Sequence, residues 1–365
     1  MKKISIVFGT RPEAIKMCPL VLELKKYNNF DVKTIVTGQH REMLDQVLSI
    51  FNVVPDIDMS IMKKGQTLSD ITMIVMSKLY TIFGNDKPDI VLVHGDTTTA
   101  FAAALASFYM KIPVGHVEAG LRTYDKNSPY PEEFNRQGIG IIADYHFAPT
   151  KMAYDNLVRE GKKSNNIYIT GNTVIDALKY TVSSDFQHPE LTWSKGSRLI
   201  FLTCHRRENI GKPMENIFRA IKRIARDFND CKIVYPVHLN PDVKELAYKV
   251  FQNEPNVHLI NPLNVIECHN FEANCYLCVT DSGGIQEECP YFGKPVLVLR
   301  NTTERPEGIK TGTLKLVGTN ENGVYKAISE LLNNENVYKS MSRANNPYGD
   351  GNASKRIADI LMKIL

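Results

Sequence analysis

The sequence predicts an α/β fold built from two doubly wound parallel-sheet domains. Short apolar segments rich in β-branched and aromatic residues alternate with longer helical segments along the whole chain. These apolar segments are continuous, as in strands that are covered on both faces of a parallel sheet. The series occurs twice, with about five strands in each, and a length of 365 residues fits two domains better than one.

The expected elements follow in order along the chain. Strands are expected at 4–8, 32–37, 90–94, 114–118 and 145–148, and helices at 13–27, 41–51, 68–83 and 98–110. The second series has strands at 198–204, 232–237, 257–260, 276–280 and 295–299. The polar, patternless stretch 183–190 is typical of a surface linker. We therefore expect domains at 1–170 and 171–350, and a last helix at about 351–365.

Composition excludes several classes of protein. Hydrophobic residues make up 43% of the chain and charged residues 23%, so large cores are expected. A net charge of +4 without a basic run argues against a nucleic-acid partner. The longest apolar stretch, at 100–110, is too short for a membrane span. The apolar start fits a first strand and is too short for a signal peptide, so a cytoplasmic location is expected.

The cysteines predict no disulfide framework, because they are seven in number and scattered. Cys275 and Cys278 have the spacing of a metal or redox pair, but they fall in an expected strand. Residues three apart in a strand face opposite sides, so a buried structural role is favoured.

The most informative stretch is 280–288, where a Ser-Gly-Gly turn follows an apolar strand and precedes a helix. Backbone N–H groups at such a turn, with the helix dipole, favour a phosphate, which would contact Ser282, Gly283 and Gly284. Glu288 follows on the helix, where a carboxylate suits a ribose diol better than a phosphate. Together these features predict a nucleotide site, and the alternative is an ordinary tight turn between strand and helix.

Ligands in parallel sheets bind beyond the carboxyl ends of the strands, so polar residues there are candidates. In the first domain, Arg11 lies at a helix start, where a cation favours an anionic partner. Asp96 follows the strand at 90–94 and could equally cap the next helix. Glu118 ends a buried strand, where a carboxylate is costly unless it is paired or functional. Glu132 opens a helix, although acidic first turns are common.

In the second domain, His205 follows the first strand and is followed by two arginines, which indicates an anion site. His238 ends the next strand, where a lone histidine is more often structural. Arg305 follows the last strand and is available for a nucleotide. If the two domains face each other, these strand ends lie across one cleft.

Common cofactor motifs are missing or misplaced. The segment 138–143 matches the dinucleotide glycine pattern, but it follows a helical stretch and precedes a strand, so the context is wrong for nicotinamide binding. Walker, zinc-spacing and nucleophile-elbow patterns do not occur in the sequence. We therefore expect neither NAD nor a metal as a cofactor.

Taken together, these residues resemble the bacterial non-hydrolysing UDP-N-acetylglucosamine 2-epimerase family. The matching strings cover nearly the whole chain in order, at 8–16, 94–97, 116–122, 131–136, 171–176, 205–209, 281–288 and 303–308. The resemblance implies a fold of the GT-B type, a homodimer, and a C-terminal helix that returns to the first domain. It also implies conversion of UDP-N-acetylglucosamine to UDP-N-acetylmannosamine for cell-surface polysaccharide synthesis.

The resemblance also implies roles for individual residues. The catalytic groups would be Asp96, Glu118, Glu132 and His205. UDP and the sugar would contact Arg11, Lys16, Arg136, Ser282, Gly283, Gly284, Glu288 and Arg305, and His205 would also contact UDP. A second UDP-N-acetylglucosamine would bind as an allosteric activator at Gln39, Arg206 and His238. The chain departs from the family in two places: Cys268 stands where relatives place an aromatic residue near uracil, and Gly65 replaces a side chain of the activator site.

This assignment agrees with the chemistry of the reaction. The C2 proton of an N-acetylhexosamine is not next to a carbonyl, so a direct abstraction gives no stabilised carbanion. Elimination of UDP with loss of that proton, followed by re-addition, needs carboxylates at C2 and cationic or dipolar groups at UDP. Three alternatives share the nucleotide site: a GT-B glycosyltransferase, a hydrolysing 2-epimerase and a non-catalytic sensor. A sensor has no use for three carboxylates.

Overall fold

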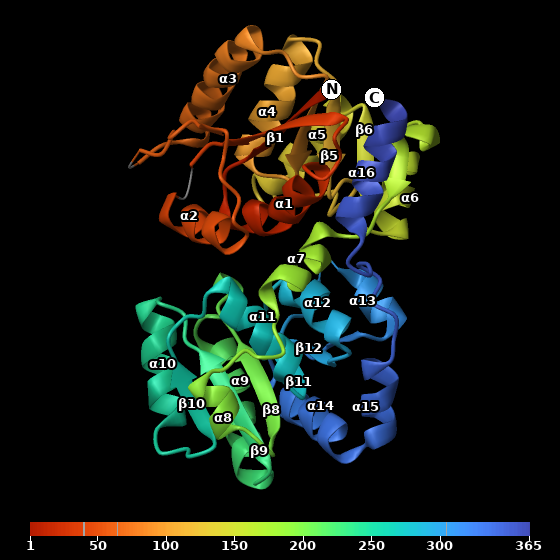
Figure 1. The fold of residues 1–365 in the computed structure, drawn as a ribbon. Helices are drawn as coiled ribbons and strands as arrows, with labels where there is room; N and C mark the ends of the chain where they lie inside the picture. Colours follow the sequence, from red (N-terminus) through yellow and green to blue (C-terminus); the bar gives the residue numbers. More distant parts are fainter. Residues whose placement is uncertain (39–40, 64, 304) are drawn as a thin grey trace. The chain divides into compact units, whose positions relative to one another are not determined.

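The computed structural model describes residues 1–38, 41–63, 65–303 and 305–365, and it divides into two compact units (Figure 1). Unit 1 comprises Met1–Tyr180 and Tyr348–Leu365, and unit 2 comprises Thr181–Pro347. Within the described residues, no helix is both long and apolar enough to span a membrane.

Unit 1 is built on a sheet whose described strands are all parallel, in the order β3-β2-β1-β4-β5-β6-β7. The order reverses between β1 and β4, so the loops after these two strands diverge to opposite faces of the sheet. The strands are β1 (Lys2–Phe8), β2 (Phe30–Val36), β3 (Ile57–Asp58), β4 (Ile90–His94), β5 (Val114–Val117), β6 (Tyr145–Ala148) and β7 (Ile167–Ile169).

Helices cover both faces of this sheet. One face packs against α1 (Arg11–Leu24), α2 (Arg41–Ile50) and α16 (Ala353–Ile364), with Ile6 and Phe8 of β1 in the shared core. The other face packs against α3 (Leu68–Asn85), α4 (Thr98–Tyr109) and α5 (Glu132–Ile142), with Val7 of the same strand in that core. This two-sided burial explains why β1 is continuously apolar. The remaining helices are α6 (Lys151–Arg159), η1 (Ser164–Asn166) and α7 (Thr173–Thr181).

The boundary of unit 1 follows Tyr180 rather than residue 170, because α7 packs with the first sheet. Ala177 of α7 is buried in the same core as Ile357 and Leu361 of α16. The Asp176 carboxylate accepts hydrogen bonds from the backbone amides of Ala353 at 3.0 Å and Ser354 at 2.7 Å. It thereby caps the first turn of α16, which Figure 1 shows in blue within unit 1.

Unit 2 repeats the design with parallel strands in the order β10-β9-β8-β11-β12-β13 among the described residues, and its order reverses between β8 and β11. Helices α9, α10 and α14 pack on one face, and α11 packs with α12 on the other. The strands are β8 (Arg198–Thr203), β9 (Cys231–Pro236), β10 (Val257–Ile260), β11 (Leu277–Thr280), β12 (Val296–Val298) and β13 (Leu314–Leu316). The helices are α8 (Pro189–Trp193), η2 (Arg207–Asn209), α9 (Lys212–Asp227), α10 (Pro241–Phe251), α11 (Val265–Asn274), α12 (Ile285–Glu288), η3 (Cys289–Phe292), α13 (Pro306–Thr311), α14 (Glu321–Asn333) and α15 (Glu335–Ser342).

The predicted fold class is confirmed, since both units are doubly wound α/β structures with parallel sheets. The sequence analysis missed β3, β7 and β13, which are three of the four edge strands of the two sheets. Each has only two or three residues, and β3 and β13 contain a charged residue, Asp58 and Lys315. Such short segments carry too little apolar pattern to be recognised.

Candidate active site

The candidate residues of unit 1 lie at the carboxyl ends of neighbouring strands. Asp96 follows β4, Glu118 follows β5, and Arg11 begins α1 directly after β1. Because β1, β4 and β5 are adjacent in the sheet, their following loops share one edge. The topology therefore brings together residues that are about a hundred positions apart in the sequence.

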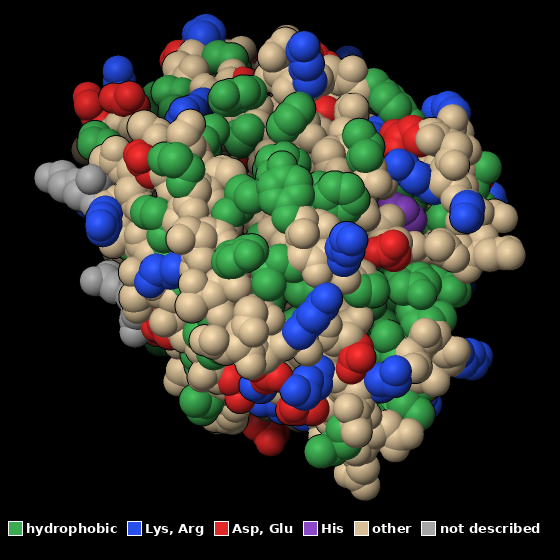
Figure 2. Space-filling view, turned by 90° about the horizontal axis from the view of Figure 1, so that it is seen from above, with side chains coloured by type: hydrophobic (Ala, Val, Ile, Leu, Met, Phe, Trp, Pro, Cys, Tyr) green, Lys and Arg blue, Asp and Glu red, His purple; other side chains and the backbone are tan. Residues whose placement is uncertain are grey.

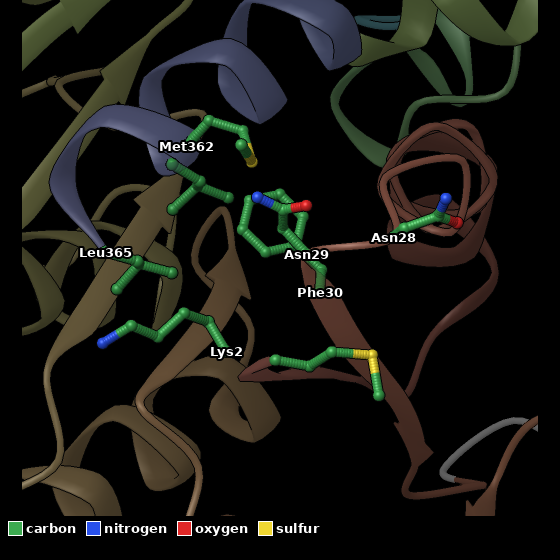
Figure 3. Close-up of a pocket in the computed structure, with 8 residues that line it drawn as sticks. Lys2, Asn28, Asn29, Phe30, Met362 and Leu365 are labelled. Carbon is green, nitrogen blue, oxygen red and sulfur yellow. The ribbon is translucent and has the colours of Figure 1, made fainter.

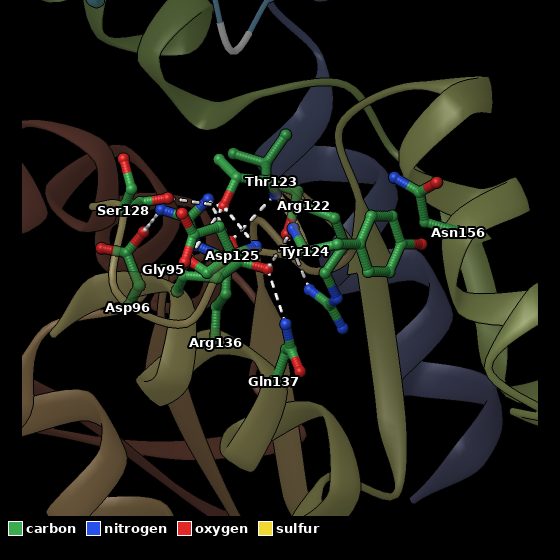
Figure 4. Close-up of polar contacts among 12 residues, drawn as sticks. Gly95, Asp96, Arg122, Thr123, Tyr124, Asp125, Ser128, Arg136, Gln137 and Asn156 are labelled. Carbon is green, nitrogen blue, oxygen red and sulfur yellow. Dashed lines mark hydrogen bonds and ion pairs between the residues drawn. The ribbon is translucent and has the colours of Figure 1, made fainter. Parts of the chain in front are cut away.

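Asp96 is held by α5. The Arg136 Nη2 donates a hydrogen bond to Asp96 Oδ2 at 2.6 Å (Figure 4). Asn135 Nδ2 donates to the Asp96 backbone carbonyl at 2.9 Å. Burial raises the pKa of the Asp96 carboxyl, and the Arg136 charge opposes this rise. The charges of Glu118 and Glu132 raise that pKa further, so both glutamates lie within electrostatic reach of Asp96.

Glu118 has a backbone φ of +63°, which is uncommon for a residue with a side chain. Its carboxylate pairs with Lys16 of α1 and accepts a hydrogen bond from Asn172 Nδ2 at 2.7 Å. The His94 Nε2 lies 3.7 Å from the same oxygen, and burial lowers the pKa of His94 to about 4, so this imidazole is neutral at pH 7. Strained backbone that the surroundings hold in place is typical of functional positions.

The loop after β1 is fixed by a buried carboxylate, Glu13. It accepts hydrogen bonds from the amides of Gly9 at 2.9 Å and Thr10 at 2.8 Å, and from Thr97 Oγ1 at 2.6 Å. Thr10 and Glu13 also form a capping box at the start of α1. This network connects the loop after β1 to the loop after β4 and sets the position of Arg11 at the helix start.

The two glutamates that open α5 differ in role. Glu133 is fully buried and accepts hydrogen bonds from the amides of Thr123 and Tyr124, each at 3.0 Å (Figure 4). It therefore anchors the loop that follows β5. Glu132 is half-buried at the start of the helix, beside the Asp96 charge. Glu132 is thus the glutamate of this pair that remains available for chemistry.

In unit 2, the buried carboxylate of Asp281 organises the candidate loop after β8. It accepts hydrogen bonds from the amides of His205 at 2.9 Å and Arg206 at 2.9 Å, and from Asn209 Nδ2 at 2.9 Å. Asp281 follows β11, so it joins the two strands at which the order of this sheet reverses. The sequence analysis gave Asp281 no role, although a carboxylate at the end of an apolar strand is itself a signal.

His205 and His238 stack with their ring centroids 5.7 Å apart. Their backbones follow the neighbouring strands β8 and β9. The Arg206 Nε donates to the Asp281 carbonyl at 3.0 Å, so all three polar residues meet at the same strand ends. The structure therefore brings the predicted catalytic His205 close to Arg206 and His238, which were assigned to an activator site.

The Ser-Gly-Gly turn connects β11 to α12. The Ser282 amide donates to Thr280 Oγ1 at 2.9 Å, so it serves the turn itself. The amides of Gly283 and Gly284 stand at the helix start, where amides have no partner within the helix. A Cβ on Gly284 would lie 3.2 Å from Glu288 Oε1, which places the Glu288 carboxylate directly beside the turn.

Arg305 is positioned by a buried ion pair. Its Nε donates to Glu287 Oε1 at 2.5 Å, and its backbone amide donates to Thr303 Oγ1 at 3.1 Å. Thr303 in turn donates to the side chain of Gln286 at 2.7 Å, so α12 fixes the segment that follows β12. Arg305 therefore lies next to the helix that carries Glu288.

The structure gives no contacts for two positions that the resemblance relates to the activator site, Gln39 and Gly65. Gln39 lies outside the described residues, so its role stays a prediction. Gly65 has a φ of +78°, and a Cβ there would meet no atom within 4 Å among the described residues.

Cys268 lies on α11, and its thiol donates to Glu272 Oε1 at 3.4 Å, which places it in the Glu288 region through Glu272.

A cavity of unit 1 lies away from the candidate residues of that unit (Figure 3). It is lined by Lys2, Phe30, Leu361 and Leu365, which lie at the amino ends of β1 and β2 and at the end of α16. This is the opposite edge of the sheet from the candidate residues, so the cavity does not belong to the site. In the described part of the chain, no three His, Cys, Asp or Glu side chains are grouped as metal ligands.

Comparison with known proteins places this arrangement in one family. The family model described as UDP-N-acetylglucosamine 2-epimerase matches residues 22–362. A Bacillus subtilis UDP-N-acetylglucosamine 2-epimerase is 59% identical over 99% of this chain and 96% of its own length.

Solved structures of this family have a fold similar to that of this chain. The structure of Staphylococcus aureus MnaA with UDP has a TM-score of 0.91 and 50% identity, covering 100% of this chain and 98% of that one. A Neisseria meningitidis UDP-GlcNAc 2-epimerase bound to UDP-GlcNAc has a TM-score of 0.89 and 46% identity, covering 99% of this chain and 100% of that one. A glycosyltransferase of 13% identity, with a TM-score of 0.68, shares the fold alone.

The carboxylate cluster of unit 1, the Ser-Gly-Gly turn of unit 2 and the match over nearly the whole chain agree with one another. The chain belongs to the UDP-N-acetylglucosamine 2-epimerase family, whose members are isomerases.

Proposed function

We propose that this protein interconverts UDP-N-acetylglucosamine and UDP-N-acetylmannosamine by eliminating UDP and adding it back through a 2-acetamidoglucal intermediate. The observation that carries the proposal is the carboxylate cluster of unit 1, in which Asp96 and Glu118 follow the adjacent strands β4 and β5 and Glu132 begins α5. Both glutamates act electrostatically on Asp96. Inversion at C2 requires a base on one face of the carbon and an acid on the other.

The charges around the cluster support proton transfer. Burial and the two neighbouring carboxylates raise the pKa of Asp96, which favours a protonated acid in that position. Glu118 is paired with Lys16 and hydrogen-bonded by Asn172, which favours the ionised form. Environments that separate two carboxyl groups in this way suit one acid and one base. We propose that Glu118 and either Asp96 or Glu132 exchange the C2 proton.

Unit 2 supplies groups that suit the departing UDP. Arg305 and His205, with the amides at Gly283 and Gly284, provide positive charge and dipoles for phosphate oxygens. Glu288 beside the turn provides an acceptor for ribose hydroxyls. In this proposal His205 and Arg11 stabilise UDP as it leaves C1, and Lys16 and Arg136 help to hold the sugar side of the substrate.

Proton NMR in D2O tests the proposal. The purified protein is incubated with UDP-N-acetylglucosamine after dialysis against EDTA, with no NAD added. We expect UDP-N-acetylmannosamine to appear and deuterium to enter C2 of both nucleotide sugars, without a cofactor. Free N-acetylmannosamine and UDP would show a hydrolysing enzyme instead, and binding without any exchange would favour a glycosyltransferase.

We further propose that UDP-N-acetylglucosamine is also an activator, bound near Arg206 and His238. If so, the reverse reaction from UDP-N-acetylmannosamine should begin with a lag that a trace of UDP-N-acetylglucosamine removes. His238→Ala should lengthen this lag and leave the plateau rate close to that of the parent protein. A reverse reaction without any lag would contradict the activator.

We also propose a homodimer formed through unit 1. Large apolar side chains are exposed on α3, α4 and α5, and hydrophobic side chains gather on the face of the molecule in Figure 2. The exposed residues include Met73, Tyr80, Phe108, Tyr109 and Ile141. An apolar surface of this kind marks an interface. Light scattering should show a dimer, and Phe108→Glu should give a monomer while the control Val158→Glu on α6 should not.

A cytoplasmic location belongs to the same proposal. All seven cysteines are free, which fits a reducing compartment. Supply of N-acetylmannosamine units to a cell-surface polysaccharide would follow, and deletion of the gene with analysis of surface sugars tests this role.

A further inference from the structure

The loop between β4 and α4 is held by strand β5. Gly95, the first residue of this loop, has a φ of +61°, and its amide donates a hydrogen bond to the Val117 carbonyl at 2.9 Å. The carbonyl oxygen of Gly95 lies 2.7 Å from Nε2 of His116, whose side chain is fully buried. Strand β5 therefore contacts Gly95 through its backbone and through a side chain, directly before the candidate acid Asp96.

The partners of the His116 ring determine its tautomer. A carbonyl oxygen can only accept a hydrogen bond, so Nε2 carries the hydrogen and donates it to Gly95. The other ring nitrogen, Nδ1, is buried and has no hydrogen-bond partner in the described part of the chain. Burial lowers the pKa of His116 to about 3, so the ring is neutral at pH 7. The ring thus acts as a neutral donor to the loop after β4.

The backbone at Gly95 benefits from such a donor because glycine is conformationally permissive. Without a Cβ it adopts positive and negative φ about equally well, so the peptide between Gly95 and Asp96 can change its orientation at little cost. A Cβ at this position would lie 3.4 Å from Glu118 Oε1, so the same peptide borders the candidate base. The hydrogen bond from His116 selects one orientation of this peptide.

The donors that hold this loop come from two different elements. Asn135 and Arg136 of α5 bind the carbonyl and the carboxylate of Asp96. His116 in contrast lies on β5, two residues before Glu118. It is therefore the side chain that connects the Asp96 loop to the strand that carries Glu118.

We propose that His116 is a positioning residue for C2 proton exchange: its Nε2–H fixes the Gly95–Asp96 peptide and thereby sets the distance between the carboxylates of Asp96 and Glu118. This inference rests on the proposed function, with Asp96 as the partner of Glu118. His116 contacts neither the substrate nor a reacting atom in this proposal, and it acts through the loop. A displacement of about 1 Å at a catalytic group can lower a rate about 10²-fold, so a single hydrogen bond at this place matters.

Two variants of His116 test the inference through C2 deuterium exchange, measured by NMR in D2O at saturating UDP-N-acetylglucosamine. In His116→Gln the amide nitrogen is as many bonds from Cβ as Nε2 is, so it can donate to Gly95. In His116→Asn the amide nitrogen corresponds to Nδ1 and does not reach that carbonyl. We expect the exchange rate to fall about 10²-fold in His116→Asn and to stay within about tenfold of the parent in His116→Gln. UDP affinity by isothermal titration should match the parent in both variants, because His116 is not among the groups proposed to contact UDP.

His146→Asn is the matched control. His146 of β6 is buried, pairs with His116 in the register of the sheet, and also has an Nδ1 without a partner among the described residues. It lies one strand further from the loop after β4, because β5 separates β6 from β4. The change should lower the melting temperature without slowing deuterium exchange.

Three results would overturn the positioning role: parent-like exchange in His116→Asn, equal losses of rate in both His116 variants, or a loss of UDP affinity that parallels the loss of rate. If His116→Asn does not fold, nitrogen NMR of the parent with isotope-labelled histidines decides, and His116→Gln assigns the signal. An Nε2–H tautomer would support the proposal, and an Nδ1–H tautomer would overturn it. A parent protein that exchanges no C2 proton would instead refute the proposed function on which this inference rests.

Discussion

Units 1 and 2 share a strand order but use their buried carboxylates in different ways. In unit 1 the loops after β4 and β5 carry Asp96 and Glu118, each paired with a cation, Arg136 and Lys16. In unit 2 the equivalent loop after β11 carries Asp281, which is occupied by hydrogen bonds from three donors of the loop after β8. The same sheet topology thus places carboxylates that are available for chemistry in unit 1, whereas in unit 2 it places a carboxylate that holds the backbone of a loop.

This difference teaches that the position of a carboxylate at a strand end does not by itself reveal its role. The role depends on the groups that contact the carboxylate. When the partner is one side-chain cation, a carboxylate oxygen remains that can accept a proton. When several backbone donors bind the carboxylate, it fixes the conformation of the loop. Glu13 in unit 1 belongs to the second kind, whereas Glu133 combines both, since it accepts backbone amides and also pairs with Arg136 at 3.3 Å.

The largest expected effect comes from Glu118→Gln. An amide keeps the shape but cannot take a proton, so we expect the rate of deuterium incorporation at C2 to fall by about 10²–10⁴-fold. UDP affinity should change little, because Glu118 is not among the groups proposed to contact UDP. Glu23→Gln, which removes a half-buried carboxylate of α1 that pairs with Lys26, is the control. Full exchange activity in Glu118→Gln would remove this residue from the proton-transfer role.

Asp281→Asn tests the opposite behaviour in unit 2. The amide replaces one acceptor oxygen by a donor group that faces other donors, so we expect a loss of stability of about 2–4 kcal/mol. Since the loop that carries His205 depends on this carboxylate, UDP binding should weaken together with the melting temperature. A protein that melts normally but does not bind UDP would show that Asp281 contacts the ligand itself.

The buried histidines of unit 1 make its stability depend on pH. Unit 1 buries His116 and His146, and burial lowers their pKa values to about 3 and about 4. The unfolded value is near 6.5, so each neutral histidine favours folding fully above that pH, and this contribution is lost as the pH falls toward the folded value. For His146 the difference between 6.5 and about 4 corresponds to about 3 kcal/mol.

We therefore expect acidification from pH 7.5 to 5 to lower the melting temperature of the parent more than that of His146→Gln. Raised pKa values of Asp96 and Asp176 act in the opposite direction, but they are common to both proteins and cancel in the comparison. Equal shifts in the two proteins would contradict the assignment to His146.

The smallest expected effect compares two capping boxes within unit 1. Thr10 and Thr67 both cap a helix and both accept the amide of the residue three positions later. Each change to Ala should cost about 1 kcal/mol in the free energy of unfolding. Only Thr10→Ala should also lower activity, because Thr10 lies in the loop that positions Arg11. Equal activities would show that this loop tolerates the lost cap.

The sequence alone was sufficient to predict the fold class and the candidate residues at the ends of strands. Strands β4, β6 and β10 begin and end where the apolar runs predict. Strands of a parallel sheet form nearly continuous runs of apolar residues, so their ends can be recognised in the sequence. Asp96, Glu118 and Glu132 were found by the rule that ligands bind beyond strand ends, and the structure brings them together.

The residues that the sequence did not reveal act through contacts between distant segments. Asn172 meets Glu118 across 54 positions, and Asp281 meets His205 across 76. Such partners become visible only when the fold places two segments side by side.

The return of α16 to unit 1 has a consequence for synthesis. Unit 2 is a continuous segment, Thr181–Pro347, whereas unit 1 needs residues from both sides of it. Domains fold as units as the chain leaves the ribosome. Residues 1–180 of unit 1 therefore emerge well before α16, the last helix of the same unit. All residues of unit 2 are synthesised before unit 1 is complete. During translation, the apolar faces of α1 and β1 that α16 covers stay exposed until that final helix arrives, which is the interval when a chaperone would be most useful to this chain.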